Sequence, residues 1–239
     1  MNKLISVIIP IYDRTDLLTQ AIESILYQDY QNFELLLIMD KSPEETKNIV
    51  MSYKYNPHVR IFETETNTGT GVIPRNIGLV EGCGEYVAFM DSDDLTLPGR
   101  FVSTVNALQD ADIVYSDYNI LDHNTGELKP IKTSQCTLDL MLNIGCYACQ
   151  STVGAKREVL LKLGGLKSKF RWCEDYELWC RALYAGYKMK YIPEKWVTYR
   201  LHDNNLEKKV KDVKWKDELL KEYKIIPDKL DLITYKKLN

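Results

Sequence analysis

The sequence predicts an α/β fold with a Rossmann-like, mainly parallel central sheet and helices on both faces. Continuous apolar runs of strand length, at residues 6–12 and 33–39, are typical of strands that are buried on both sides. The first run precedes a segment whose apolar residues recur at helical spacing. Strands that alternate with helices favour a parallel sheet, because each crossover helix covers one face of it.

The first part of the chain repeats this strand-and-helix unit. Further strands are expected at residues 59–62 and 86–90. The segment 43–53 has the composition of a helix, and a glycine-containing loop leads to a short helix from Pro74. These elements extend the parallel sheet.

The rest of the chain is less regular. A turn at residues 122–126 is consistent with a β-hairpin. The other elements are helices expected at 98–108, 156–163 and 174–185, and short strands expected at 113–116, 189–192 and 197–201. No linker or internal repeat separates the two parts, so we expect one domain over residues 1–205, with halves of about 1–95 and 96–205.

The composition excludes several classes of function. The formal net charge is −3 and no basic stripe interleaved with aromatic residues precedes the tail, so nucleic acid is not expected as a partner. No apolar run is long enough to span a bilayer, and the first residues lead straight into a strand rather than a leader peptide. We therefore expect a cytoplasmic protein.

Residues 206–239 form a tail of different character, predicted as a basic helix. Five lysines lie between residues 208 and 216, and apolar residues recur there at near-helical spacing. Two interpretations are open: a helix in peripheral contact with the anionic inner face of the membrane, or a surface helix docked on the domain by its apolar side.

An acidic cluster directly follows the expected strand 86–90. Asp91, Asp93 and Asp94 are separated only by Ser92, and ligands of α/β sheets bind beyond the carboxyl ends of the strands. Such carboxylates hold Mg²⁺ or Mn²⁺ together with the phosphates of a substrate. The alternative is a solvated turn that caps the next helix. The cluster alone does not separate these two interpretations.

Two other strand ends carry residues that suit a nucleotide. Asp40 follows the second strand, and Tyr12 and Asp13 follow the first. If the strands are neighbours, the aromatic ring stacks on a base, the lone carboxylate accepts a base N–H, and a metal at the acidic cluster bridges the phosphates. Because neither G-x-G-x-x-G nor G-x-x-x-x-G-K-[ST] occurs, a metal is expected to neutralise the phosphates.

Two further groups complete the candidate site. Glu174 and Asp175 open a helix, where acids are favoured by the helix dipole, but an acid beside an aromatic segment also suits a general base. His202 ends the last expected strand, where it is either structural or within reach of a metal.

Six segments occur in a characteristic order along the chain: SVIIPIYDR, ELLLIMDKS, NTGTGVIPRNIGL, GEYVAFMDSDD followed by LPGR, CEDYELWCRAL and YRLH. With this order the chain resembles the inverting family-two glycosyltransferases of GT-A fold, from about Ser6 to His202. One departure is visible. The second strand of this family commonly ends in two acids and a glycine, whereas here Met39 and Lys41 flank Asp40.

The resemblance implies roles for individual residues. It implies Asp175 as catalytic base and Asp93, Asp91 and His202 as ligands of Mn²⁺ or Mg²⁺, with Asp91 and Asp93 forming the DxD motif. The residues implied to bind the nucleotide are Pro10, Tyr12, Asp13, Asp40, Arg75, Asp91 and Ser92. Residues 1–95 would then be the nucleotide-binding half and residues 96–205 the acceptor and catalytic half, with a smaller region on the acceptor side.

The activity implied is an inverting transfer of a sugar from a nucleoside-diphosphate sugar, with UDP expected, to an acceptor hydroxyl. A glycan or lipid-linked acceptor in surface polysaccharide assembly is the implied setting. Two alternatives remain: a sugar nucleotidyltransferase, and a non-catalytic module that binds nucleotide sugars. The first would need a glycine-rich, arginine-bearing loop after the first strand, which residues 10–15 do not offer.

Overall fold

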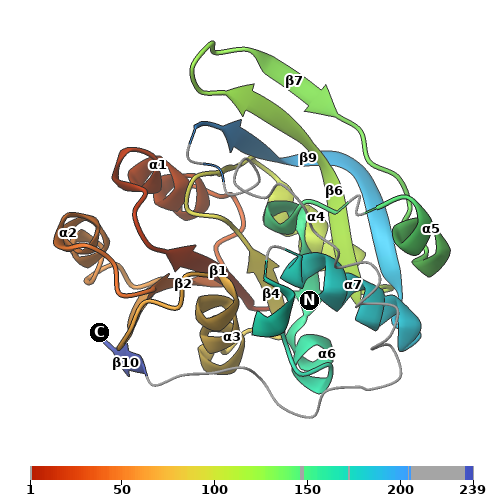
Figure 1. Cartoon of the computed structure of the whole chain (residues 1–239), viewed down its shortest axis with the longest axis horizontal. Helices are drawn as coiled ribbons and strands as arrows, with labels where there is room; N and C mark the ends of the chain where they lie inside the picture. Colours follow the sequence, from red (N-terminus) through yellow and green to blue (C-terminus); the bar gives the residue numbers. More distant parts are fainter. Residues whose placement is uncertain (1, 146–147, 172, 204, 206–234, 239) are drawn as a thin grey trace.

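The central sheet joins the two halves of the chain into one body. The computed structural model describes residues 2–145, 148–171, 173–203, 205 and 235–238. Within these residues the strands form one ten-stranded sheet in the order β10-β3-β2-β1-β4-β8-β6-β9-β5, and β7 pairs with β6 (Figure 1). The Rossmann-like α/β prediction is confirmed.

The first half contains the parallel part of the sheet. Its strands are β1 (Ile5–Ile11), β2 (Phe33–Met39), β3 (Val59–Thr64) and β4 (Tyr86–Phe89), and its helices are α1 (Thr15–Leu26), α2 (Glu44–Ser52) and α3 (Val72–Glu81). β1 lies between β2 and β4, and its two pairings are parallel, as is the pairing of β2 with β3. The carboxyl ends of these strands therefore meet at one edge.

The strands of the second half run in both directions. Its strands are β5 (Leu95–Thr96), β6 (Ile113–Asp122), β7 (Leu128–Ile131), β8 (Gly154–Lys156) and β9 (Met189–Leu201), and its helices are α4 (Arg100–Ala107), α5 (Leu138–Asn143), η1 (Gln150–Thr152), α6 (Arg157–Lys162), η2 (Ser168–Phe170) and α7 (Glu174–Tyr184). β8 runs antiparallel to both β4 and β6, whereas β6 and β9 are parallel. The hairpin expected at residues 122–126 joins β6 to β7.

Several expected elements differ from the structure. The strand expected at 113–116 continues to Asp122 as β6, and the helix expected from Pro74 begins at Val72. The two short strands expected at 189–192 and 197–201 are one strand, β9, because the whole segment pairs with β6 across a shift of register at Asp117. The helix expected from Pro98 begins at Arg100, because Gly99 adopts a left-handed φ of 82° that a helix does not contain.

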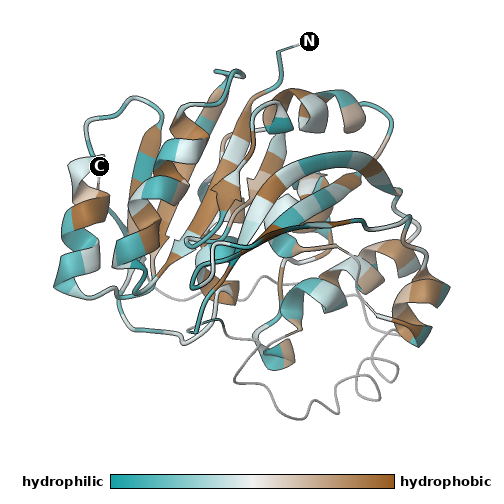
Figure 2. Ribbon diagram, turned by 90° about the horizontal axis from the view of Figure 1, so that it is seen from above, coloured by the Kyte–Doolittle hydropathy of each residue, from teal (hydrophilic) through white to brown (hydrophobic). Residues whose placement is uncertain are grey.

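Two hydrophobic cores lie on opposite faces of the sheet. Alternate strand residues point to opposite sides, so Val7 and Ile9 join one core and Ile8 joins the other. Helices α1, α2 and α4 contribute to the first core, and α3, α5, α6 and α7 contribute to the second. Figure 2 shows the apolar strands between helices whose outer sides are hydrophilic. Helices on both faces were predicted, and this is confirmed.

The tail prediction is only partly covered by the structure. Residues 206–234 and 239 lie outside the described residues, so the predicted basic helix is not described. Tyr235–Lys237 is a strand, β10, rather than helix, and pairs antiparallel with the edge strand β3. Lys236 reaches Glu63 at 3.1 Å and the Tyr235 hydroxyl donates to Glu81 at 2.7 Å. These contacts and the free edge of β3 favour a strand there.

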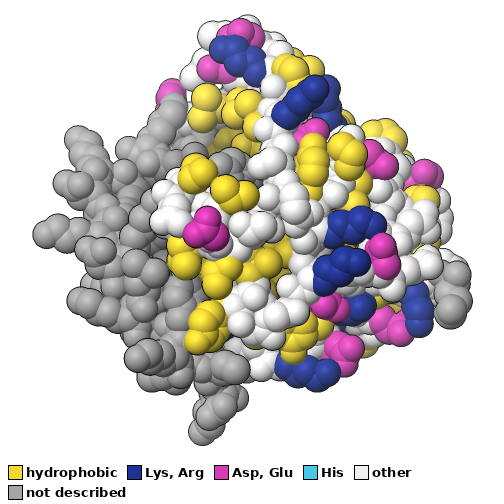
Figure 3. All heavy atoms as spheres, turned by 90° about the vertical axis from the view of Figure 1, so that its right-hand side faces the viewer, with side chains coloured by type: hydrophobic (Ala, Val, Ile, Leu, Met, Phe, Trp, Pro, Cys, Tyr) yellow, Lys and Arg dark blue, Asp and Glu magenta, His cyan; other side chains and the backbone are white. Residues whose placement is uncertain are grey.

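No helix among the described residues is long and apolar enough to cross a bilayer. Figure 3 shows one side of the molecule, where basic, acidic and apolar side chains are interspersed.

Candidate active site

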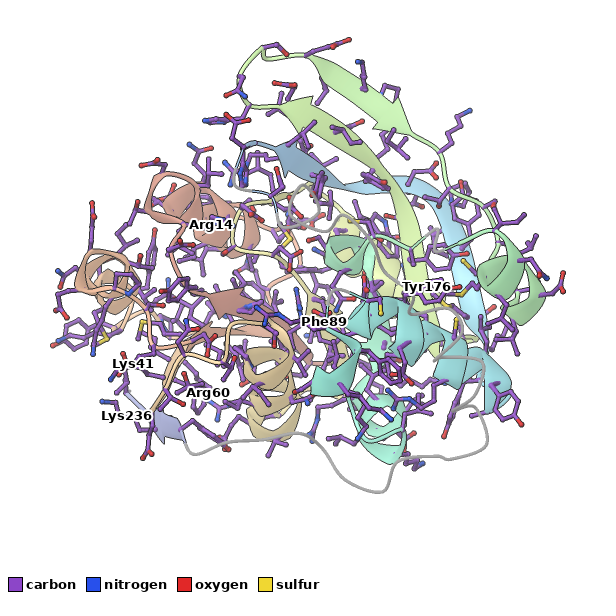
Figure 4. The ribbon with its side chains drawn as sticks, in the orientation of Figure 1. Arg14, Lys41, Arg60, Phe89, Tyr176 and Lys236 are labelled. Atoms are coloured by element: carbon purple, nitrogen blue, oxygen red, sulfur yellow. The ribbon has the colours of Figure 1, made fainter. Side chains whose placement is uncertain are left out.

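The strand ends bring the first group of predicted residues together. Ile11 pairs with Met39 in the β1–β2 ladder, so Tyr12 and Asp40 follow at the same level of neighbouring strands. On the other side of β1, Ile8 pairs with Phe89, and the acidic cluster follows β4 two residues later. Figure 4 shows Arg14 beside α1 and Phe89 at the end of β4, with Tyr176 on the α7 side. The expected adjacency of the strand ends is confirmed.

Asp40 anchors the loop between β3 and α3. Its carboxylate is 4% exposed and accepts hydrogen bonds from the Thr68 amide at 3.0 Å, the Thr68 hydroxyl at 2.9 Å and the Gly69 amide at 3.2 Å. The Thr64 hydroxyl donates to it at 3.2 Å. Asp40 therefore fixes this loop at the carboxyl edge of the sheet, and its contact with a base remains a prediction.

Lys41, which departs from the family pattern, has an uncommon backbone. It is the one non-glycine residue with positive φ in the described part of the chain, at 52°. A side chain in the left-handed region costs about 1 kcal/mol relative to glycine. Lys41 therefore carries a small conformational cost that a glycine at this position would avoid.

Asp93 is held by two basic side chains. The Arg14 Nε donates to its Oδ2 at 3.1 Å, and the Nε2 of His202 lies 3.1 Å from the same oxygen. Burial acts to raise the pKa of Asp93, but the hydrogen bonds and charges of His202 and Arg14 outweigh it and hold the pKa below its ordinary value. Asp93 is therefore an ionised carboxylate, and His202 lies beside it as predicted.

Asp91 pairs with Arg75, which also faces the start of α7. The Arg75 Nη2 lies 2.5 Å from Asp91 Oδ1, and its Nη1 lies 3.6 Å from Glu174 Oε1. Burial acts to lower the pKa of Arg75, but the charges of Asp91 and Glu174 raise it. One guanidinium thus connects the carboxyl end of β4 to the helix that carries Asp175.

Asp175 has the pKa of a general base near neutrality. Burial raises its pKa to about 7, with a further increase from the charge of Glu174. The amide of Tyr176, which donates to Asp175 at 2.7 Å, and the charge of Arg75 act in the opposite direction. A carboxylate whose pKa lies close to the working pH combines a large ionised fraction with a strong tendency to accept a proton.

Asp94 has a structural role that differs from the alternative of a helix cap. It is fully buried and accepts from the Ser151 hydroxyl at 2.5 Å and the Arg200 amide at 3.0 Å. Burial and the neighbouring charges of Asp93 and Asp91 raise its pKa well above the ordinary value. Helix α4 starts six residues later without any side-chain cap. The expectation that this cluster caps the helix is therefore wrong.

The ligand set fits a cation that arrives with a diphosphate. Within the described ranges, no three His, Cys, Asp or Glu side chains surround a common point, and Asp91 is turned toward Arg75. The Nε2 of His202 and the ionised Oδ2 of Asp93, however, lie 3.1 Å apart, so a ring nitrogen and a carboxylate oxygen are adjacent. Mg²⁺ is commonly bound by one or two carboxylates plus substrate phosphates rather than by an all-protein cage, and Mn²⁺ accepts the same oxygen ligands. The residues present therefore fit a divalent cation that is also bound by the phosphates of a substrate.

The remaining predicted residues lie along the same edge. Tyr12 is 45% exposed beyond β1, Asp13 is exposed and pairs with Arg14 at 2.7 Å, and Ser92 is buried within the cluster. Pro10 lies in β1, opposite Ile38. The exposed ring of Tyr12 is available for stacking on a base.

Three residues of the site were absent from the predicted set. Arg14 pairs with Asp93, and its place directly after a strand end was the signal that could have identified it. Ser151 accepts from the Asp91 amide at 3.1 Å as well as donating to Asp94, and Arg200 donates to the backbone carbonyl of Asp93. Both are far from the cluster in sequence, so only the fold brings them there.

Comparison with known proteins identifies the class of protein to which this fold and site belong. Residues 6–158 match the model of the family described as Glycosyl transferase family 2. An uncharacterized glycosyltransferase of Haemophilus influenzae is 35% identical over 181 residues, which cover 72% of this chain and 69% of that protein. One from Rickettsia typhi is 28% identical over 212 residues, covering 84% of this chain and 65% of that protein.

Solved structures share the fold. The S. aureus TarS fragment 1–349 in complex with UDP-GlcNAc has a TM-score of 0.73 at 19% identity, covering 92% of this chain and 65% of that one. The mannosyltransferase PcManGT of Pyrobaculum calidifontis, in complex with GDP-Man and Mn²⁺, has a TM-score of 0.64 at 19% identity, covering 84% of this chain and 58% of that one.

The chain belongs to glycosyltransferase family 2 and has the GT-A fold. It spans 65% of the length of the Rickettsia typhi relative.

Proposed function

We propose that this chain is an inverting glycosyltransferase that moves a sugar from a nucleoside-diphosphate sugar, with UDP as the nucleotide, to an acceptor hydroxyl. The observation that carries the proposal is the position of Asp175, whose pKa is raised to about 7, at the start of a helix joined through Arg75 to Asp91. The residue assigned as general base is thus connected through Glu174 and Arg75 to the acidic cluster. Membership of family 2 and the fold shared with a UDP-GlcNAc complex support it.

The nucleotide is assigned to the strand ends of the first half. Tyr12 offers a half-exposed ring for the base, and Asp40 fixes the adjacent loop through Thr68 and Gly69. A base carried at this level places its diphosphate toward Asp91 and Asp93, which follow the neighbouring strand. The exposed carboxylate of Asp13 is assigned to the same nucleotide.

The reaction needs a proton acceptor on the acceptor side. Asp175, when ionised, takes the proton from the acceptor hydroxyl as that oxygen attacks the anomeric carbon. The bond to the nucleoside diphosphate breaks on the opposite face of the sugar, so one displacement inverts the configuration. A divalent cation bound at Asp93, Asp91 and His202 would stabilise the negative charge on the leaving diphosphate. Arg14 holds Asp93 ionised for that role.

The acceptor is proposed to be a glycan or a lipid-linked sugar in surface polysaccharide assembly. Peripheral contact with the inner membrane face remains a proposal of the sequence alone, because residues 206–234 lie outside the described part of the chain.

The test begins with a panel of UDP and GDP sugars, with and without Mn²⁺ or Mg²⁺. A donor that binds the native state raises the unfolding temperature, and slow hydrolysis of that donor releases the nucleoside diphosphate. The product of transfer is then examined by NMR for the configuration at the anomeric carbon. Retention of configuration would reject the single displacement. Release of pyrophosphate from a sugar phosphate and a nucleoside triphosphate would favour a nucleotidyltransferase instead.

A further inference from the structure

Arg75 occupies a space that only a glycine leaves open. Helix α3 begins after Gly71, and a Cβ atom built at Gly71 would lie 2.3 Å from Arg75 Nη1 and 2.9 Å from its Cζ. No such overlap is tolerated by real side chains, so any residue other than glycine would displace the guanidinium. The backbone of Gly71 does not itself require glycine, because its φ of −76° is accessible to every residue.

The guanidinium spans two elements that the sequence separates widely. Asp91 follows β4 and Glu174 opens α7, yet Nη2 and Nη1 of Arg75 lie 2.5 Å and 3.6 Å from their carboxylates. The side chain of Arg75 is 9% exposed, and those of Asp91 and Glu174 are 29% and 15% exposed. Partial shielding from water strengthens these interactions relative to surface ion pairs. Burying a cation is favourable only when such partners are present.

A second arginine joins the same two regions. Arg171, three residues before α7, donates from Nη2 to the carbonyl of Gly69 at 3.1 Å. Gly69 is itself held by Asp40. Among the residues that the structure describes, both Arg171 and Arg75 therefore connect the region at the start of α7 to the nucleotide-binding half, and the Arg75 contact reaches the acidic cluster.

We propose that Arg75 is a positioning residue that ties Glu174 to Asp91 and thereby sets the distance between Asp175 and the acidic cluster. Asp175 follows Glu174 in the first turn of α7, so a shift of Glu174 moves the base with it. This inference rests on the proposed roles of Asp175 and Asp91. It gives Arg75 a function in the chemical step that differs from the nucleotide contact implied by the family resemblance.

The test uses Gly71→Ala, which displaces the guanidinium without removing any charged group. The atoms that the new methyl group meets belong to the flexible end of a side chain, so the variant is expected to fold. Misplacement of a catalytic group by about 1 Å costs up to about 10²-fold in rate. We therefore expect kcat to fall about 10- to 10²-fold, with little change in KM or in the Kd of the nucleoside diphosphate. Val80→Ala, at an exposed position of the same helix, is the matched control and should leave both constants unchanged.

A double-mutant cycle with Glu174→Gln identifies the route of the effect. If both substitutions break one bridge, the double variant should be no slower than the slower single variant. Additive losses would overturn the proposal, as would a Gly71→Ala variant with unchanged kcat. If Gly71→Ala raises KM and Kd but leaves kcat unchanged, Arg75 is a nucleotide contact, and the proposal is overturned as well. Arg75→Lys keeps the positive charge but loses the two guanidinium nitrogens that reach Asp91 and Glu174 together. This variant should therefore behave like Gly71→Ala.

One readout does not depend on sugar transfer. Amide hydrogen exchange in the peptide covering residues 173–181 should accelerate in Gly71→Ala and not in Val80→Ala, because the first turn of α7 loses its tether. If the wild-type protein transfers no sugar but this difference is seen, the proposed function fails and the tether stands. If the exchange rate of this peptide is unchanged in Gly71→Ala, the proposed role of Arg75 as a tether is overturned, whatever the activity of the protein.

Discussion

The two halves of the molecule build their parts of the site in different ways. In the first half, parallel strands end at one edge, and each delivers its polar residue there directly: Tyr12 after β1, Asp40 after β2 and Asp91 after β4. In the second half, the strands run in both directions, and Asp175 and His202 come from a helix start and a strand end far apart in sequence. The first half is placed by its own sheet, whereas the second must be attached to it.

That attachment is made by polar side chains buried at the boundary. Asp93 contacts His202, Asp94 contacts Ser151 and the Arg200 amide, and Arg75 faces Glu174. Because each contact crosses from one half to the other, the acidic cluster has both a chemical and a structural function. Substitutions at the strand ends of the first half should therefore affect nucleotide binding, and those in α7 or in its contact with Arg75 should affect the chemical step.

Asp175→Asn should give the largest loss of activity and distinguish most clearly between the functions of the two halves. Asn has the same shape but accepts no proton, so kcat should fall about 10²- to 10⁴-fold, the usual contribution of a general base. Titration with the nucleoside diphosphate should give the wild-type Kd, because the strand ends are untouched. Asp16→Asn, an exposed acid in α1, is the charge-matched control. Substantial remaining activity would remove Asp175 from the role of base.

The pH dependence of the wild-type protein should report the same base. Burial and the charge of Glu174 raise the pKa of Asp175 to about 7, and only the ionised form accepts a proton. Activity should therefore fall about tenfold for each pH unit below 7, measured as kcat/KM at constant ionic strength. An acid limb near pH 4 would show that the carboxylate is not shifted in the free protein.

Asp93→Asn tests the metal assignment in the first half. Loss of the ionised oxygen that faces His202 should raise the Mn²⁺ concentration for half-maximal activity at least about tenfold, since even outer-shell substitutions cost 10- to 100-fold in metal affinity. Metal titrations at saturating donor, with binding of Mn²⁺ followed separately by electron paramagnetic resonance, measure this. An unchanged metal requirement would exclude Asp93 as a ligand.

Asp94→Ala tests the structural link between the halves. It leaves the Ser151 hydroxyl and the Arg200 amide without their acceptor, which should lower the free energy of unfolding by about 1–3 kcal/mol. Asp94→Asn keeps an acceptor for the amide and is expected to lose less. Urea denaturation followed by circular dichroism compares the two. Equal stability of Asp94→Ala and the wild-type protein would mean that these hydrogen bonds do not join the halves.

Lys236→Ala, in β10, should give the smallest effect. Lys236 is 58% exposed, and Glu63 retains Lys47 at 3.2 Å, so the loss should be about 0.2–1 kcal/mol in the same denaturation measurement. Donor binding and kcat should not change. A loss of activity in this variant would show that the edge of the first half communicates with the site.

The sequence by itself determined the parallel half and its strand-end residues. Apolar runs and helical spacing follow from burial, and a strand that is closely followed by Asp40 or Asp91 places that acid at the edge of the sheet without further information. The order of motifs also gave the family, which the comparisons confirmed. These properties are local, so neighbouring residues encode them.

Only the tertiary structure decided how the acids are used. The sequence predicted one acidic cluster, but pairing divides it: Asp93 is ionised beside Arg14 and His202, Asp94 is buried against Ser151 and the backbone, and Asp91 faces Arg75. The merged strand β9 and the return of β10 to β3 likewise depend on partners distant in the chain. The charge state and role of a carboxylate are set by burial and by the groups around it, and these come together only when the chain has folded.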